Sequence, residues 1–155
     1  FVFEGFGDFR DLRIVARSFA TRCSADLIWR NNLFEGRLAA NQDGSAVVET
    51  RLGRFPIPAV AGASTGSTVA FVVAADRVRV SRESNPARPS IPCRLISEEF
   101  VGATITLYLE AATGSELKAQ ITERDLAAID LKADQQLHVS WSLEDVHVLP
   151  GRLTR

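Results

Sequence analysis

The stretch Val69-Ala-Phe-Val-Val-Ala-Ala-Asp-Arg-Val-Arg-Val80 is matched by Leu137-His-Val-Ser-Trp-Ser-Leu-Glu-Asp-Val-His-Val148. The two segments start 68 positions apart and keep their register to the last residue, where Val80 meets Val148. Each begins with apolar residues at every second position, which is the pattern of a half-buried strand. We interpret the two segments as the same element of a duplicated β-module.

The duplication extends over most of the chain. Further aligned pairs lie 57 to 62 positions apart: Arg37 with Arg94, Ala46–Leu52 with Ala103–Leu109, Val48 with Ile105, and Phe55 with Leu117. This alignment places five extra residues of the second copy in a hairpin around 110–114, and six more near 122–129. Because the insertions fall in turns, each copy is expected to form about five short strands.

Local signals refine this pattern. Pro56 and Pro58 remove two backbone donors from one strand, which therefore belongs at a sheet edge. Thr122 and Asp125 have the spacing of a capping box, so we expect a short helix near 122–130.

The sequence divides into five segments. Residues 1–31 form a connecting segment with helical spacing of Leu12, Val15, Ala16 and Phe19, so we expect helical turns there. Residues 32–81 form the first copy, 82–92 a proline-rich linker, 93–150 the second copy and 151–155 a tail.

Composition narrows the class of protein. The 155 residues are 46% hydrophobic and 24% charged, with a net charge of −1, which argues against a nucleic-acid surface. No apolar run approaches the roughly 20 residues that span a bilayer. Cys23 and Cys93 stand in no CxxC pair, and we expect them to be reduced and separate. Since the chain starts at Phe1 and contains no Met, we interpret it as part of a longer polypeptide.

The sequence predicts no catalytic residue and no metal site. His138 and His147 lie on strands without a neighbouring His or Cys, whereas zinc sites need clustered ligands. The turn Gly62–Thr68 lacks the lysine of a phosphate-binding loop and precedes a strand where a helix is required. No nucleophile elbow is present either.

The segment Glu98–Leu109, followed by Val139–Leu149, resembles the TOBE domain, the C-terminal part of ATP-binding subunits in ABC importers. The specific signal is Ser-Trp-Ser-Leu-Glu-Asp-Val-His-Val-Leu at Ser140–Leu149, which looks like the subgroup serving iron, polyamine, sulfate or phosphonate uptake. The resemblance covers 32–150, while residues 9–31 and Lys132–Asp134 depart from it. The positions that match the family motif are Gly36, Gly53, Gly102, Trp141, Glu144 and Asp145.

The resemblance implies an all-β fold of two tandem OB-like lobes, of the TOBE or MOP type, with intertwined strands. It implies a non-catalytic regulatory and dimerisation domain. The expected partners are the same domain of a second ATPase subunit, an upstream ATPase domain and, indirectly, the membrane permease. ATP and Mg²⁺ are expected only upstream, with no cofactor in this chain. The expected location is cytoplasmic, peripheral to the inner membrane through the transporter complex.

An alternative is an oxyanion-binding module of the MOP type, for molybdate-like or sulfate-like anions. Backbone amides and hydroxyls at a lobe junction can bind an oxyanion. The candidate residues are Ser67 and Thr68, with Ser64 and Thr65 beside them, or Arg94 with Thr104. A nucleic-acid-binding OB barrel is disfavoured by the charge, and we expect Trp141 to pack in a core rather than stack on bases.

Overall fold

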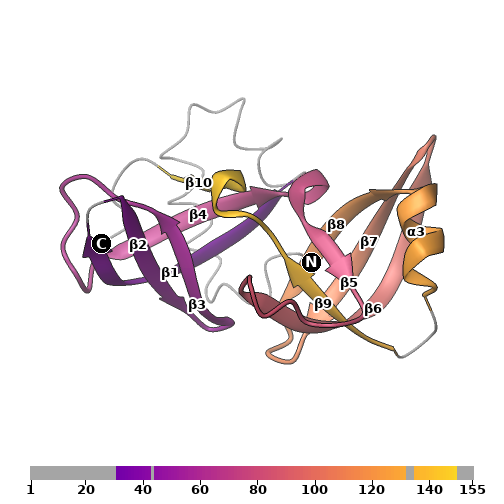
Figure 1. Cartoon of the computed structure of the whole chain (residues 1–155), viewed down its shortest axis with the longest axis horizontal. Helices are drawn as coiled ribbons and strands as arrows, with labels where there is room; N and C mark the ends of the chain where they lie inside the picture. The colour runs from indigo at the N-terminus through magenta and orange to yellow at the C-terminus, as the bar shows by residue number, and fades with distance from the viewer. Residues whose placement is uncertain (1–30, 43, 132–134, 150–155) are drawn as a thin grey trace.

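The computed structural model describes residues 31–149, apart from residue 43 and residues 132–134. Two β-lobes lie side by side along the long axis of the molecule (Figure 1). The helical turns predicted before residue 31 and the changed turn predicted at Lys132–Asp134 lie outside the described residues.

Each lobe contains one five-stranded antiparallel sheet. The first sheet has the order β10-β4-β1-β2-β3, made by Val146–Val148, Thr68–Ala74, Asn31–Gln42, Ser45–Thr50 and Gly53–Pro58. The second has the order β5-β9-β6-β7-β8, made by Arg79–Ser81, Gln136–Ser140, Ser90–Val101, Thr104–Ala111 and Glu116–Thr122. The predicted all-β fold is therefore confirmed, and the strand with Pro56 and Pro58, β3, lies at a sheet edge as expected.

The two copies exchange one short strand each. Strand β10 comes from the second copy and pairs with β4 of the first, where Val146 faces Val73. Strand β5 comes from the first copy and pairs with β9 of the second, where Val80 faces Val139. The crossings are two 3-10 turns, η1 (Ala75–Arg77) and η2 (Leu143–Asp145). The lobes are thus intertwined, as predicted (Figure 1).

A β-bulge marks the same point in both copies. The register of β1 against β2 shifts between Leu38 and Ala40, and that of β6 against β7 shifts between Leu95 and Ser97. The bulges lie 57 positions apart, which is the separation of Arg37 from Arg94. A bulge adds one residue to one strand and bends it, so its repetition supports the duplication in β1 and β6.

The next strand corrects part of the sequence alignment. Leu38 faces Val48 in the first lobe, whereas its counterpart Leu95 faces Leu109 in the second. The structural counterpart of Val48 is therefore Leu109, and the alignment with Ile105 is wrong by four residues. The extra residues of the second copy lie mainly in the β6–β7 hairpin, not around 110–114. A shift of four preserves the alternation of faces, so the apolar pattern could not detect it.

The linker is shorter than predicted, because β6 already begins at Ser90. Pro92 pairs with His138 of β9, while the pairing with β7 starts one residue later, at Cys93. Pro92 has no backbone N–H to donate, and no strand pairs with it on the side where that N–H would be needed.

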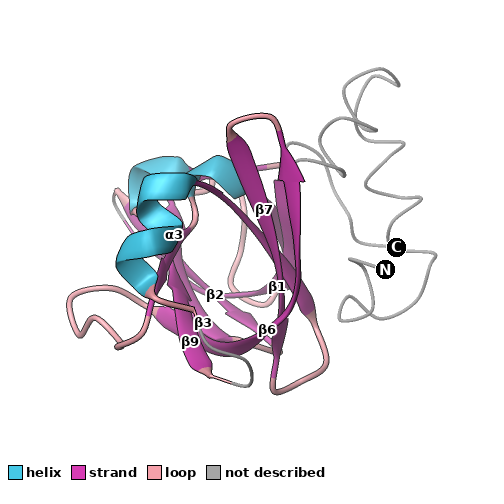
Figure 2. Ribbon diagram, turned by 90° about the vertical axis from the view of Figure 1, so that its right-hand side faces the viewer, coloured by secondary structure: helices cyan, strands magenta, loops and turns pink. Residues whose placement is uncertain are grey.

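The short helix predicted after β8 is present as α3, Glu123–Ile129. The backbone N–H of Asp125 donates to Thr122 Oγ1 at 3.2 Å, and the N–H of Thr122 donates to Asp125 Oδ2 at 3.4 Å. These reciprocal bonds satisfy two free donors at the helix start and confirm the capping box. Figure 2 shows α3 lying against the strands of the second lobe.

The two cores are filled by different side chains. In the first lobe, Trp141 lies 5.1 Å from Phe34 and 5.3 Å from Phe55, measured between ring centres. Trp141 is 4% exposed, which confirms that it packs in a core. The second core is aliphatic, and its largest fully buried side chains are Ile91, Ile105, Leu107, Leu109, Leu117 and Leu137.

Candidate functional site

The two crossing turns meet where the lobes join. Arg77 in η1 and Asp145 in η2 form an ion pair of 3.9 Å. These residues are 68 positions apart and occupy the same place in each copy. Two equivalent residues can touch only near the two-fold axis that relates the copies, so this pair lies close to that axis. Asp145 is largely buried, whereas the neighbouring Glu144 is exposed to solvent.

A buried side-chain amide connects the lobes a second time. Asn32 on β1 is 3% exposed. Its Nδ2 donates to the carbonyl of Lys118 on β8 at 2.8 Å, and its Oδ1 accepts the N–H of Lys118 at 2.7 Å. The amide therefore takes the role of a neighbouring strand and satisfies two buried backbone groups.

The outer side of β7 and β8 carries a small electrostatic cluster. The Tyr108 hydroxyl donates to Glu99 Oε2 at 2.9 Å. Burial, then this bond, then the charges of Glu99 and Glu116 raise the pKa of Tyr108. Lys118 Nζ lies 6.0 Å from the centre of the Tyr108 ring. Burial lowers the pKa of Lys118, and the charges of Glu116 and Glu99 partly offset that effect.

Each lobe carries one row of cross-strand partners, and the two rows are equivalent in the duplication. Neighbours in a row share one face of the sheet. The first row is Thr68, Arg37, Glu49 and Arg54, from β4, β1, β2 and β3. The second row is Gln136, Arg94, Glu110 and Glu116, from β9, β6, β7 and β8.

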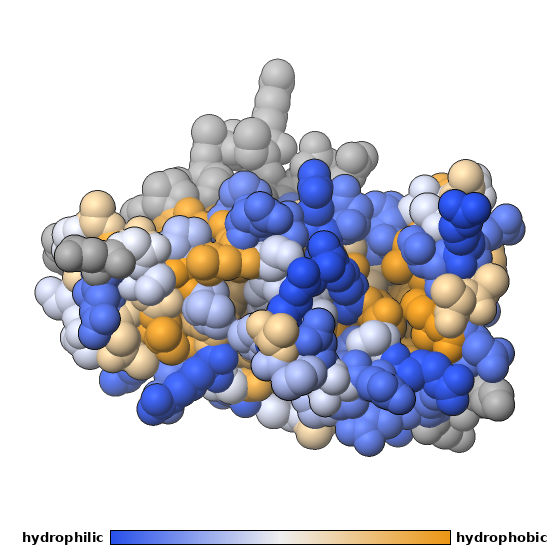
Figure 3. All heavy atoms as spheres, in the orientation of Figure 1, coloured by the Kyte–Doolittle hydropathy of each residue, from blue (hydrophilic) through white to orange (hydrophobic). Residues whose placement is uncertain are grey.

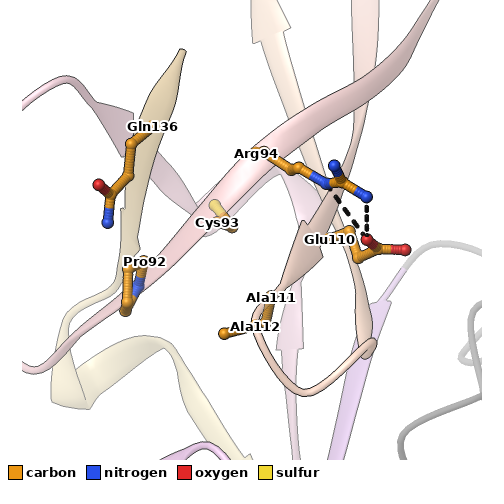
Figure 4. A pocket seen from close by; sticks show the side chains of 7 residues that line it. All are labelled: Pro92, Cys93, Arg94, Glu110, Ala111, Ala112 and Gln136. Atoms are coloured by element: carbon orange, nitrogen blue, oxygen red, sulfur yellow. Dashed lines mark hydrogen bonds and ion pairs between the residues drawn. The ribbon is translucent and has the colours of Figure 1, made fainter. Parts of the chain in front are cut away.

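A groove lies beside each row. The first-lobe groove has a volume of about 490 Å³ and is lined by residues 35–39, 49–51, Thr65 and Gly66. The second-lobe groove has a volume of about 410 Å³ and is lined by Pro92, Cys93, Arg94, Glu110, Ala111, Ala112 and Gln136 (Figure 4). Both grooves are open, so a ligand could enter and leave without a conformational change.

The arginines of the two grooves are held differently. Arg94 donates to one oxygen of Glu110 through Nη2 at 2.7 Å and Nε at 3.2 Å (Figure 4). In the first lobe, Glu49 instead pairs with Arg54 at 3.2 Å. Arg37 is exposed and has no ion-pair partner within the described part of the chain.

The structure brings together only some of the predicted anion ligands. Thr104 faces Val101 at the far end of the β6–β7 hairpin, and Arg94 faces Glu110. Six residues of extended strand separate Thr104 from Glu110, which is roughly 20 Å. Arg94 and Thr104 therefore cannot share a small ligand.

The other predicted pair lies in the first lobe, where Thr68 is the cross-strand partner of Arg37. Two amides of the turn before it are already bonded within the lobe. The N–H of Gly66 donates to Leu38 at 2.7 Å, and that of Ser67 donates to Ser64 at 3.1 Å. Arg37 is not among the ligands predicted from the sequence, although its alignment with Arg94 could have identified it.

The comparisons with known proteins agree with the duplicated β-fold. Residues 65–149, more than half of the chain, match the sequence model of the TOBE domain. The chain belongs to the TOBE domain family. Among solved structures, the TOBE chain is similar to that of the cytoplasmic molybdate-binding protein ModG with molybdate bound. The TM-score is 0.68 at 17% identity, covering 76% of this chain and 94% of that chain. A comparison with curated proteins found no significant sequence match.

The structure explains why glycine occupies three of the positions that match the TOBE motif. A Cβ atom on Gly36 would lie 2.7 Å from Val48 Cγ1 and closer still to the carbonyl oxygen of Glu49, so no larger residue fits there. Gly53 and Gly102 have φ values of 128° and 61°, which favour glycine in the turns that they form. Of the six positions, Gly102, Trp141, Glu144 and Asp145 lie inside the TOBE match.

Three other features of this TOBE domain can be described: its cysteine thiol, its possible metal ligands and the length of its helices. Cys93 is a buried, free thiol, and burial raises its pKa to about 12, so it is protonated and unreactive near neutral pH. Cys23 lies outside the described residues. Within those residues, no three His, Cys, Asp or Glu side chains are grouped to share a metal ion. The described helices are also too short or too polar to cross a bilayer.

Proposed function

We propose that this chain is a non-catalytic module that binds a small oxyanion. The observation that carries this proposal is an exposed arginine, Arg37, which lines an open groove. A guanidinium group matches an oxyanion because its fork of N–H donors can bind two oxygens at once. The likeness of the fold to the molybdate-binding protein ModG supports the proposal.

The chemistry of the grooves fits binding without reaction. Arg37 adds a guanidinium cation and Thr65 a hydroxyl group to the lining of the first groove, whereas the Thr50 hydroxyl already donates to the carbonyl of Gly53 at 3.0 Å. Among the described residues, no hydroxyl or thiol that lines either groove is hydrogen-bonded to a carboxylate or imidazole that could act as its general base. The proposed ligand is a small anion that is bound and released unchanged.

A thermal-shift titration tests this proposal. The chain is heated with increasing molybdate, tungstate, sulfate or phosphate at constant ionic strength, with chloride as the control. A ligand that binds only the folded state raises Tm with a saturating dependence on its concentration. If none of the four anions raises Tm above the chloride control at millimolar concentration, the proposal is rejected.

A second function is favoured by the family and by one surface. Beyond the last pair of β6 with β9, Arg94 with Gln136, the β6–β7 hairpin extends with large apolar side chains exposed. Ile96 is 52% exposed, Phe100 58% and Val101 62%. Large apolar side chains exposed on one projecting hairpin suit a contact with another protein. Figure 3 shows one face of the molecule, on which apolar residues surface in separate patches between charged ones.

This second proposal is a regulatory and dimerisation domain at the C-terminus of an importer ATPase subunit. The partners would be a second copy, an upstream ATPase domain that binds ATP and Mg²⁺, and indirectly a permease, on the cytoplasmic side of the inner membrane. Light scattering over a wide concentration range tests the self-association. We expect a dimer that Phe100→Ser weakens and that Leu143→Ser, at another exposed site, leaves unchanged. A strict monomer at every concentration contradicts self-association of this chain.

A further inference from the structure

The two equivalent rows differ in charge. The first row contains Arg37, Glu49 and Arg54 and has a net charge of +1. The second contains Arg94, Glu110 and Glu116 and has a net charge of −1. The net charge changes sign because of the last position of the row, where β3 carries Arg54 and β8 carries Glu116.

This one difference explains the different ion pairs. Glu49 lies between two arginines, and its carboxylate pairs with Arg54, which leaves Arg37 to solvent. Glu110 lies between an arginine and a glutamate, so Arg94 is the only cation beside it in the row. The side chain at the edge strand therefore decides whether the central arginine is available.

From this we infer that the oxyanion site is confined to the first-lobe groove, at the guanidinium of Arg37. The inference deepens the proposed function and rests on it. In the second groove an anion would have to displace Glu110 from Arg94, breaking two charge-assisted hydrogen bonds. It would also approach the negative charge of Glu116, whereas the same position in the first row is occupied by Arg54.

The remaining lining of the first groove suits a small anion. Thr65 places a hydroxyl group in the lining. Thr68 is the direct cross-strand neighbour of Arg37. Arg51 adds a second guanidinium group, which offsets the carboxylate of Glu35. The chain therefore binds one oxyanion although its fold contains the groove twice.

The first experiment uses two matched variants, Arg37→Gln and Arg94→Gln, in the full chain. Both residues are exposed and occupy the same place in the duplication, so neither change should affect folding, which the Tm without ligand verifies. Calorimetric titration with molybdate and with sulfate at constant ionic strength gives affinity and stoichiometry. We expect one site per chain, weakened about tenfold or more by Arg37→Gln and by less than about twofold by Arg94→Gln.

The outcomes separate this inference from the proposed function. If the unmodified chain binds neither anion, the proposed function fails and the site assignment fails with it. If it binds and Arg94→Gln causes the loss, or if two equal sites appear, only the assignment to the first lobe is overturned.

A third variant tests the reason for the asymmetry. Glu116→Arg gives the second row the charge of the first and offers Glu110 another cation. We expect Arg94 to become available and the stoichiometry to rise from one to two per chain. A stoichiometry that stays at one, in a variant with unchanged Tm, contradicts the role assigned to Glu116.

Discussion

The two lobes share one order of strands and differ, among other features, in their interiors and in one external charge. Phe34, Phe55 and Phe71 fill the first core, and the second has Ile91, Leu117 and Val139 at the corresponding positions. Such large changes are accepted because apolar character is kept at each inward position and the neighbours change volume together. The fold therefore depends on the alternation along the strands, whereas the groove depends on individual surface side chains.

The largest expected effect concerns the tryptophan that only one lobe contains. Trp141→Ala removes a buried indole between Phe34 and Phe55 and should reduce the free energy of unfolding by about 3–5 kcal/mol. Val73→Ala, at the equivalent position of the first copy, should cost less because two methyl groups are lost. Urea unfolding followed by circular dichroism measures both, and equal losses would contradict the importance of the aromatic core.

The next effect concerns a lobe contact that exists once. Asn32→Leu leaves the N–H and C=O of Lys118 buried without this partner and should cost about 2–4 kcal/mol. Its counterpart in the second copy is Pro89, which cannot form such a bridge.

Asn41→Leu is the matched control, because this amide bonds Val60 and Ala63 within one lobe and is partly buried. We expect a smaller loss there. If the two variants unfold at the same urea concentration, the bridge between lobes contributes nothing beyond its hydrogen bonds.

The strand exchange could be expected because the motif at Ser140–Leu149 resembles that of the TOBE domain, whose lobes are intertwined. The sequence could not place the β6–β7 hairpin, since a register shift of four leaves every residue on its face. The predicted grouping of Arg94 with Thr104 is also wrong, because the partner of Arg94 across the hairpin is Glu110. Ion pairs across strands depend on register, which alternation alone does not determine.

A third prediction concerns Cys93, whose counterpart in the first lobe is Gly36. Burial raises the pKa of the thiol from 9.0 to about 12. Between these values the unfolded chain loses the proton and the folded chain keeps it, so stability falls as pH rises. The expected contribution is about 1.4 kcal/mol per pH unit above pH 9 and none below it.

Urea unfolding at several alkaline pH values, compared between the unmodified chain and Cys93→Ala, isolates this contribution. Other titrating groups are common to both proteins and cancel in the difference. A difference that is independent of pH up to 11 would show that the thiol ionises freely in the folded state.

The smallest effect is expected at the ion pair near the two-fold axis. Arg77 is 65% exposed, and the distance to Asp145 is 3.9 Å, so solvent screens the pair. A double-mutant cycle with Arg77→Ala and Asp145→Ala should give a coupling free energy of about 0.2–1 kcal/mol, decreasing in salt. A coupling above about 2 kcal/mol would mean that this contact, rather than Asn32, connects the lobes.

The exchange of β5 and β10 has a consequence for the integrity of the molecule. Proteolytic cleavage between β5 and β6 would produce two fragments, each holding a strand of the other's sheet. The fragments should therefore stay associated without a covalent link and separate only on denaturation. A single copy synthesised alone could fill the gap in its sheet only by swapping strands with another molecule, and the fusion makes that encounter independent of protein concentration.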